Sequence, residues 1–205
     1  GHCGYPIRGG CLMADPAYIV DGVLTDGEAW VGIAHAAVSL PAATVTFTST
    51  DDGQTGDFSQ YMDLVLVSYG RNGDGSASVM KMHLNDDTAA NYVLQQLYSD
   101  GSAVTASSTT TSTYLDFFWY PPSATAANVF ACSVTTLFDI NSGKFKSAIA
   151  QVANDMDGSG YVALVANTWK NQSPITEIDL TDYSGNNIAA GSMFSLFGVL
   201  PRMVA

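Results

Sequence analysis

Residues 44–50 read TVTFTST, and their apolar side chains recur at every second position. Val45 and Phe47 fall on one side of an extended chain and the threonines on the other, which predicts a strand with one buried face. Similar segments, separated by Gly, Asn, Asp and Pro, recur along the chain. They lie at residues 28–40, 61–70, 77–85, 91–100, 111–120, 129–140, 144–154, 161–170, 175–183 and 192–200.

Four stretches of the chain make more specific predictions. YMDLVLVSYG (61–70) is apolar on both faces, which predicts a central strand. Residues 86–97 have weak helical spacing, but their β-branched and aromatic content favours a turn followed by a strand. In 77–85 the residues expected to face inward are Met80, Met82 and Leu84. In 129–140 the residues expected on one face are Phe130, Cys132, Val134, Phe138 and Ile140, with Cys132 buried as a small hydrophobe.

The acidic residues support an all-β protein. Apart from Glu28 and Glu177 they are all Asp, which favours turns where Glu favours helices. Many short strands joined by turn residues predict a two-sheet antiparallel β-sandwich, jelly-roll-like, over residues 43–205. The Gly- and Ala-rich residues 1–42 are expected to form an N-terminal arm with one or two strands, docked and possibly anchoring the protein.

Charge and hydropathy exclude two classes of partner. The net charge is −12 with seven Lys and Arg, and none of these seven lies between Gly9 and Gly70. Nucleic-acid binding needs clustered basic residues, so none is expected. No apolar run reaches the length of a membrane span, and no signal peptide opens the chain, so no membrane is expected as a partner.

The three cysteines do not form a disulfide framework. Cys3 and Cys11 lie in a Gly-rich stretch and could close a small loop. Together with His2 they would offer a metal only three ligands at no standard spacing. We therefore expect no metal site and no cofactor.

Catalytic groups are sparse. His35 and His83 are interpreted as structural or surface residues, and neither a G-x-S-x-G nor an H-E-x-x-H motif occurs. A pair of carboxylates can catalyse glycoside hydrolysis, so a depolymerase is one alternative function, and the least favoured one. The pairs here, at 51–52, 86–87 and 155/157, lie in turn-like sequences that explain Asp without chemistry. We expect a protein that is not an enzyme.

Two Gly-rich turns resemble calcium loops only in part. In NDMDGSG (154–160), Asp155 and Asp157 have the required spacing, but Ala166 stands where an EF-hand needs its bidentate Glu. RNGDGS (71–76) is similarly incomplete. Hairpin turns are the favoured interpretation of both.

Aromatic residues supply a binding hypothesis. YLDFFWYPP (114–122) places some rings on each face of a strand, so one face is expected in the core. The other face could be a subunit interface, which is favoured, or a sugar-stacking platform. The candidate contact residues are Tyr114, Phe118, Tyr120, Trp169 and Tyr183.

Four short motifs follow one another between residues 43 and 200. They are Tyr61 with Leu64; Asn85 to Tyr92; Trp169 with Ile175, Ile178 and Leu180; and Gly191-Ser192 followed by Ser195-Leu196-Phe197-Gly198-Val199. In this order they resemble a group of tailed-bacteriophage virion proteins that end in a G-S-x-x-S-L-Y-G-I motif. Phe197, Val199 and the Asn85-Asp86-Asp87 triplet depart from that pattern, and the Gly that normally precedes the Trp is displaced.

The resemblance implies a jelly-roll sandwich in the phage particle and no transferable catalytic residue. We expect a non-enzymatic virion structural protein, assembled in the host cytoplasm: a capsid decoration or cement protein, a head fibre or a tail-fibre component. Such modules are commonly homotrimers, so the expected partners are further copies of the chain and the major capsid protein or other virion proteins. The alternative is a receptor-binding module on the virion surface that recognises a host glycan.

Overall fold

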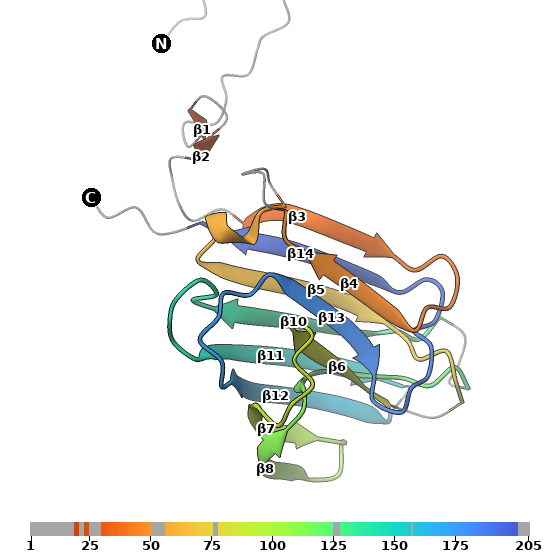
Figure 1. The fold of residues 1–205 in the computed structure, drawn as a ribbon. Helices are drawn as coiled ribbons and strands as arrows, with labels where there is room; N and C mark the ends of the chain where they lie inside the picture. Colours follow the sequence, from red (N-terminus) through yellow and green to blue (C-terminus); the bar gives the residue numbers. More distant parts are fainter. Residues whose placement is uncertain are drawn as a thin grey trace, which may run out of the picture.

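The computed structural model describes residues 19–20, 23–24, 30–50, 56–75, 78–124, 128–156 and 158–200. Within these residues the chain forms antiparallel strands in two sheets that face each other, and the only helical element is a 3₁₀ turn, Phe58–Gln60 (Figure 1). The predicted all-β, two-sheet antiparallel sandwich is confirmed. A further two-stranded ribbon pairs β1 (Ile19–Val20) with β2 (Val23–Leu24).

The larger sheet has eight strands. β5 is flanked by β14 and β10, so it is the central strand that its two-sided apolar pattern predicts. In spatial order the strands are β3 (Trp30–Ala37), β14 (Met193–Val199), β5 (Asp63–Gly70), β10 (Ala131–Phe138), β11 (Lys146–Asp155), β12 (Gly160–Trp169), β7 (Tyr92–Ser99) and β8 (Val104–Ser112).

The smaller sheet covers part of the inner face of the larger one. Its order is β4 (Thr44–Thr48), β13 (Glu177–Asp182), β6 (Ser78–Leu84) and β9 (Leu115–Tyr120). Figure 1 shows β8 at one end of the larger sheet, beyond the strands of the smaller sheet.

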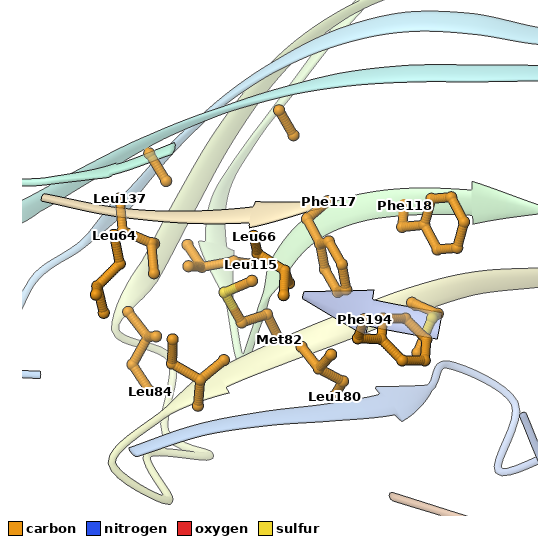
Figure 2. Packing of buried hydrophobic residues seen from close by; sticks show 14 of the residues in the cluster. Leu64, Leu66, Met82, Leu84, Leu115, Phe117, Phe118, Leu137, Leu180 and Phe194 are labelled. Atoms are coloured by element: carbon orange, nitrogen blue, oxygen red, sulfur yellow. The ribbon is translucent and has the colours of Figure 1, made fainter. Parts of the chain in front are cut away.

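The core lies between the two sheets. Val45 and Phe47 are buried, and Met80, Met82 and Leu84 are fully buried, as the alternation predicts. Figure 2 shows leucines of β5 facing residues of β6 and β13 across this space. Each such side chain contributes roughly 1.5–3 kcal/mol when removed from water, so the inter-sheet layer supplies the main driving force for folding.

The sandwich begins at Trp30, within the segment that we expected to be an arm ending at residue 42. β3 pairs along its length with β14, placing Ala36 opposite Phe194 and Ala34 opposite Leu196. On its inner side, Val31, Ile33 and Ala36 pack against the core, so this segment is part of the sandwich.

A β-bulge explains why strict alternation fails in β9. Met80 of β6 stands opposite Phe118, but Lys81 stands opposite Asp116, which leaves Phe117 as an extra residue. Phe117 and Phe118 are consequently both buried, although they are adjacent in the sequence. The alternation predicted them on opposite faces.

The motif residues of the resemblance meet in space. Gly198 of β14 packs under the ring of Tyr61, and a Cβ atom on Gly198 would lie 2.3 Å from two ring carbons. The Asp87 carboxylate accepts hydrogen bonds from Trp169 Nε1 (2.7 Å) and Asn91 Nδ2 (2.9 Å). The first motif, which contains Tyr61, therefore contacts the last, which contains Gly198. The second motif, which contains Asp87, is hydrogen-bonded to the third, which contains Trp169.

Asn85 adds another tie between the second and third motifs. It adopts a positive φ of 54°, which Asn tolerates better than most residues. Its side-chain oxygen accepts hydrogen bonds from the backbone N–H groups of Thr176 and Glu177, and its amide donates to the carbonyl of Pro174. The motif residues therefore hold the sandwich together.

Candidate functional site

The outer face of the larger sheet is the surface that points away from the smaller sheet. Strand register aligns its side chains in rows: Tyr69 lies between Met193 and Cys132, and Val134 stands opposite Val67. Its exposed apolar members are Tyr69, Leu97, Val104, Val134, Phe138, Val162, Leu164 and Met193. Exposed fractions of 67% for Val162 and 49% for Leu97 show that no part of the described chain covers them.

The same face carries almost no charge. Among the outward positions of β14, β5, β10, β11, β12 and β7, the only charged residues are Asp63 and Asp155, each at the end of its strand. The chain as a whole has a net charge of −12. Apolar side chains share this face with neutral polar ones, such as Ser195, Gln151 and Thr136. A broad, nearly uncharged surface with exposed apolar groups on a strongly acidic protein is a candidate interaction site.

The middle of β10, together with Ser68 of the neighbouring β5, has its polarity reversed relative to a sheet whose outer face meets water. Ser68, Ser133 and Thr135 point inward and are buried, and their hydroxyls have no hydrogen-bond partner among the described residues. Cys132 and Val134 point outward and are exposed. Our prediction of a buried Cys132 is therefore wrong, because the apolar row of this strand forms the outer face and its hydroxyl row faces the core.

The outer face is hollowed where β10, β11 and β12 approach the β7–β8 hairpin. This hollow has a volume of about 590 Å³. Its apolar lining includes Val67, Leu97, Val104, Val134 and Leu164. A second hollow of about 550 Å³ continues along β7 and β8, where Gln95, Gln96 and Ser107 add polar groups.

β8 forms one edge of the sheet and is exposed along all its residues except Ser112. Its sequence, VTASSTTTS, contains none of the Lys or Pro residues that commonly protect an edge strand from pairing with another chain. The edge and the outer face therefore offer one continuous surface for contact.

The aromatic residues predicted as contacts separate into two groups. Phe118, Tyr120 and Trp169 are fully buried, so their prediction as contact residues is wrong. Phe118 stands opposite the buried Met80, the Tyr120 hydroxyl donates to Asp182 (2.6 Å), and Trp169 donates to Asp87.

Tyr114 and Tyr183 form the second group. Their rings meet edge to face with centroids 5.8 Å apart, and Lys81 Nζ lies 5.9 Å from each centroid. Tyr183 is 59% exposed. The pair borders the smaller sheet, away from the outer face of the larger one.

Three carboxylates gather beside the smaller sheet. Single oxygens of Asp86, Glu177 and Asp179 lie within 4.8 Å of one another and could hold a divalent cation. Thr46 and Thr48 donate hydrogen bonds to Asp179 and Glu177, so two of these carboxylates already have neutral partners. An exposed acidic group of this kind needs no cation.

The turns expected from the Asp- and Gly-rich segments are present. Asp155 accepts a hydrogen bond from the backbone N–H of Gly158, and Asn72 accepts one from the N–H of Asp74. Each closes a local turn. Asp51, Asp52, Asp157, His2, Cys3 and Cys11 lie outside the described residues.

The two histidines within the described residues have separate surroundings. His35 Nδ1 lies 2.9 Å from the Ser195 hydroxyl of the neighbouring strand. Burial lowers the pKa of His83, and the nearby Lys81 ammonium lowers it further. His35 joins β3 to β14, while His83 belongs to the smaller sheet.

Comparison with known proteins gave no family: no protein-family model and no curated protein matches this chain. In the part of the chain that the structure describes, no helix is long and apolar enough to cross a membrane.

Proposed function

We propose that this chain is a non-enzymatic structural protein of a bacteriophage virion, acting as a capsid decoration or cement protein, a head fibre or a tail-fibre component. It associates with further copies of itself as a homotrimer and with the major capsid protein or another virion protein. The observation that carries the proposal is the outer face of the larger sheet, which exposes apolar side chains and confines its two carboxylates to strand ends.

The size of this face suits a stable contact. Six strands about 4.8 Å apart and roughly seven residues long span on the order of 29 by 23 Å, or roughly 700 Å². A stable protein interface buries about 800 Å² on each partner. The outer face, with the neighbouring edge strand β8, reaches this size.

The charge distribution favours a second copy as the partner. Two chains that each carry −12 repel one another, and an acidic contact surface would add to that repulsion. The outer face confines its two carboxylates to strand ends, so the outer faces of three copies can meet around a three-fold axis without burying like charges.

The motif contacts support the virion assignment. Gly198 with Tyr61 and Asp87 with Trp169 join distant parts of the chain inside the sandwich. These motif residues make structural contacts inside the fold. This agrees with the resemblance to virion proteins, which implies a fold and no catalytic residue.

Light scattering on purified protein tests self-association. We expect a trimer at micromolar concentration for the wild-type chain, and monomers for Val134→Asp and Leu164→Asp, which place charges in the middle of the outer face. Thr44→Asp, an exposed position on β4 of the smaller sheet, is the matched control and should remain trimeric. A wild-type chain that stays monomeric up to about 100 μM, roughly −5.5 kcal/mol of binding free energy, would overturn the proposal.

Immunogold labelling of purified phage particles tests the virion assignment. Antibodies against the folded chain should decorate the capsid surface, a head fibre or the tail at a regular position. Labelling confined to infected-cell lysate, with none on intact or partly disassembled particles, would rule the assignment out.

A further inference from the structure

Lys81, Tyr114 and Tyr183 form a cluster on the outward side of the smaller sheet, which we call the Lys81 cluster. Met80 and Met82 are buried in the core, so Lys81, which lies between them on β6, points outward. Tyr114 precedes β9 and Tyr183 follows β13, the two strands that pair with β6. The tyrosine rings meet edge to face with centroids 5.8 Å apart, and Lys81 Nζ lies 5.9 Å from each centroid. Three neighbouring strands thus bring an ammonium and two aromatic rings together.

Lys81 has no acidic partner, although the chain holds 19 acidic and only seven basic Lys and Arg residues. Among the described residues, no carboxylate forms an ion pair with its Nζ atom and no oxygen accepts a hydrogen bond from it. Strand register places Asp116 opposite Lys81. Asp116 is only 7% exposed, however, and its carboxylate accepts hydrogen bonds from the Trp119 indole N–H (3.2 and 3.3 Å). The donors of the ammonium therefore remain available to a group from outside the chain.

Two other lysines show how ammonium groups are satisfied elsewhere in this fold. Lys144 Nζ forms an ion pair with Asp139 (3.1 Å). Lys146 is buried, and its Nζ atom donates hydrogen bonds to three backbone carbonyls. Lys81 differs from both, because its ammonium contacts aromatic rings and its side chain is partly exposed.

The members of the cluster are held in place before any ligand arrives. The Tyr183 backbone N–H donates to the carbonyl of Val79 on β6 (2.8 Å). The Tyr114 N–H donates to the Ser112 hydroxyl (3.3 Å), and that hydroxyl donates to the Tyr114 carbonyl (2.9 Å). Lys81 lies in the middle of β6, which is paired on both sides. Groups held in this way lose little conformational freedom when a ligand binds.

We propose that the Lys81 cluster binds a carboxylated sugar, such as a hexuronic acid or a sialic acid. The sugar carboxylate would accept hydrogen bonds from the Lys81 ammonium, which supplies three donors. The apolar C–H groups of the sugar would pack on the ring of Tyr183, which is 59% exposed, and its hydroxyls would bind the phenol groups. The cluster lies away from the outer face of the larger sheet, so this role does not rest on the assembly function proposed above.

The charges of the chain narrow the class of ligand. A net charge of −12 repels polyanions, so nucleic acids and ligands with several phosphates are disfavoured. A neutral sugar would leave the ammonium without an anion. A sugar with one carboxylate on each ring meets both conditions. Because the cluster is exposed and encloses little of its ligand, a single sugar should bind with a Kd on the order of 1 mM.

The experiment titrates the full-length chain with methyl β-glucuronide and methyl β-glucoside, which differ only where a carboxylate replaces a hydroxymethyl group. The methyl glycoside of N-acetylneuraminic acid represents the sialic acids. Binding is measured by saturation-transfer NMR. We expect the glucuronide or the sialoside to bind saturably and at least 10-fold more tightly than the glucoside, and the acid that binds identifies the class of sugar.

Substitutions separate a ligand site from a simple packing contact. Lys81→Met keeps much of the side-chain stem and removes the charge, so affinity for the acidic sugar should fall at least 10-fold, whereas Lys81→Arg should retain it within a few-fold. Lys170→Met removes the charge of another exposed lysine and should leave affinity unchanged. Tyr183→Ala removes the stacking surface and should weaken binding several-fold. The Tm of Lys81→Met should stay within about 2 °C of the wild-type value, because Lys81 points away from the core.

Three results would each overturn the proposal: no saturable binding of either acid, equal affinity for the glucuronide and the glucoside, or an affinity that Lys81→Met leaves unchanged. Full displacement of the sugar by an equal concentration of sodium acetate would also overturn it, because the cluster would then bind an adventitious ion only. Val134→Asp should bind the acidic sugar as the wild type does, so failure of the assembly proposal and failure of this one give different results.

Discussion

At the scale of single residues, the terminal motif has a steric explanation. Gly198 is buried in β14, where any side chain would enter the ring of Tyr61. Alternation in the sequence places Phe194, Leu196 and Gly198 on one face, and a glycine within such a strand predicts a close neighbour. The sequence therefore indicates that a ring or backbone packs there, but only the fold identifies Tyr61, which lies 137 residues earlier.

We predict that Gly198→Ala lowers the free energy of unfolding by about 3 kcal/mol or more, because Tyr61 is itself buried and cannot move aside without disturbing the core. Urea denaturation measures the change. Gly32→Ala is the matched control: Gly32 lies in the paired strand β3, a Cβ atom there meets nothing within 4 Å, and the effect should be within about 0.5 kcal/mol. If the steric explanation is right, adding Tyr61→Ala to Gly198→Ala should cost less than the sum of the single changes. Strict additivity would contradict it.

At the scale of elements, period-two patterning identified nearly all the strands of the sandwich. It could not identify which row of β10 faces inward, because this strand carries the hydroxyls of Ser133 and Thr135 toward the core and the side chain of Val134 outward. It also placed the β9 aromatics incorrectly, since a bulge shifts the phase by one residue without a signal in the sequence. The hollow of about 590 Å³ on the outer face was equally hidden, because it combines residues of six strands that only the sheet order brings together.

β9 carries a titratable group that makes stability depend on pH. Burial raises the pKa of Asp116 to about 6, and the hydrogen bond from Trp119 only partly opposes that rise. Between about pH 4 and pH 6 the folded chain therefore holds a proton that the unfolded chain releases, so stability falls as pH increases through this window. The loss amounts to roughly 3 kcal/mol between pH 4 and pH 7.

Urea denaturation at several pH values tests this prediction, and Asp116→Asn should flatten the dependence between pH 4 and 6.5. Asp87 provides a contrast. Burial raises its pKa, but hydrogen bonds from Asn91 and Trp169 outweigh burial and lower it below the usual value. Asp87 therefore stabilises the fold above about pH 4 and loses that effect only in stronger acid. An unchanged slope in Asp116→Asn would show that another group is responsible.

At the scale of the whole molecule, a sheet of eight strands faces one of four. The smaller sheet can cover only part of the inner face, and the described chain places nothing on the outer one. Composition already indicated a protein that is poor in charge for its size, with 13% charged residues. Composition could not show that the carboxylates avoid one broad face, because that follows from strand register.

This separation of charge from the outer face predicts how association responds to salt. Copies with a net charge of −12 repel one another over about 10 Å at 0.1 M salt and about 30 Å at 0.01 M. The outer face holds no ion pairs for salt to weaken, so screening should only reduce the repulsion between copies. We expect the trimer to become at least several-fold tighter when sodium chloride is raised from 10 to 300 mM, as measured by sedimentation equilibrium. Val134→Asp should remain monomeric at both concentrations. Dissociation at high salt would mean that charged groups hold the copies together, and the outer face would then not be the contact.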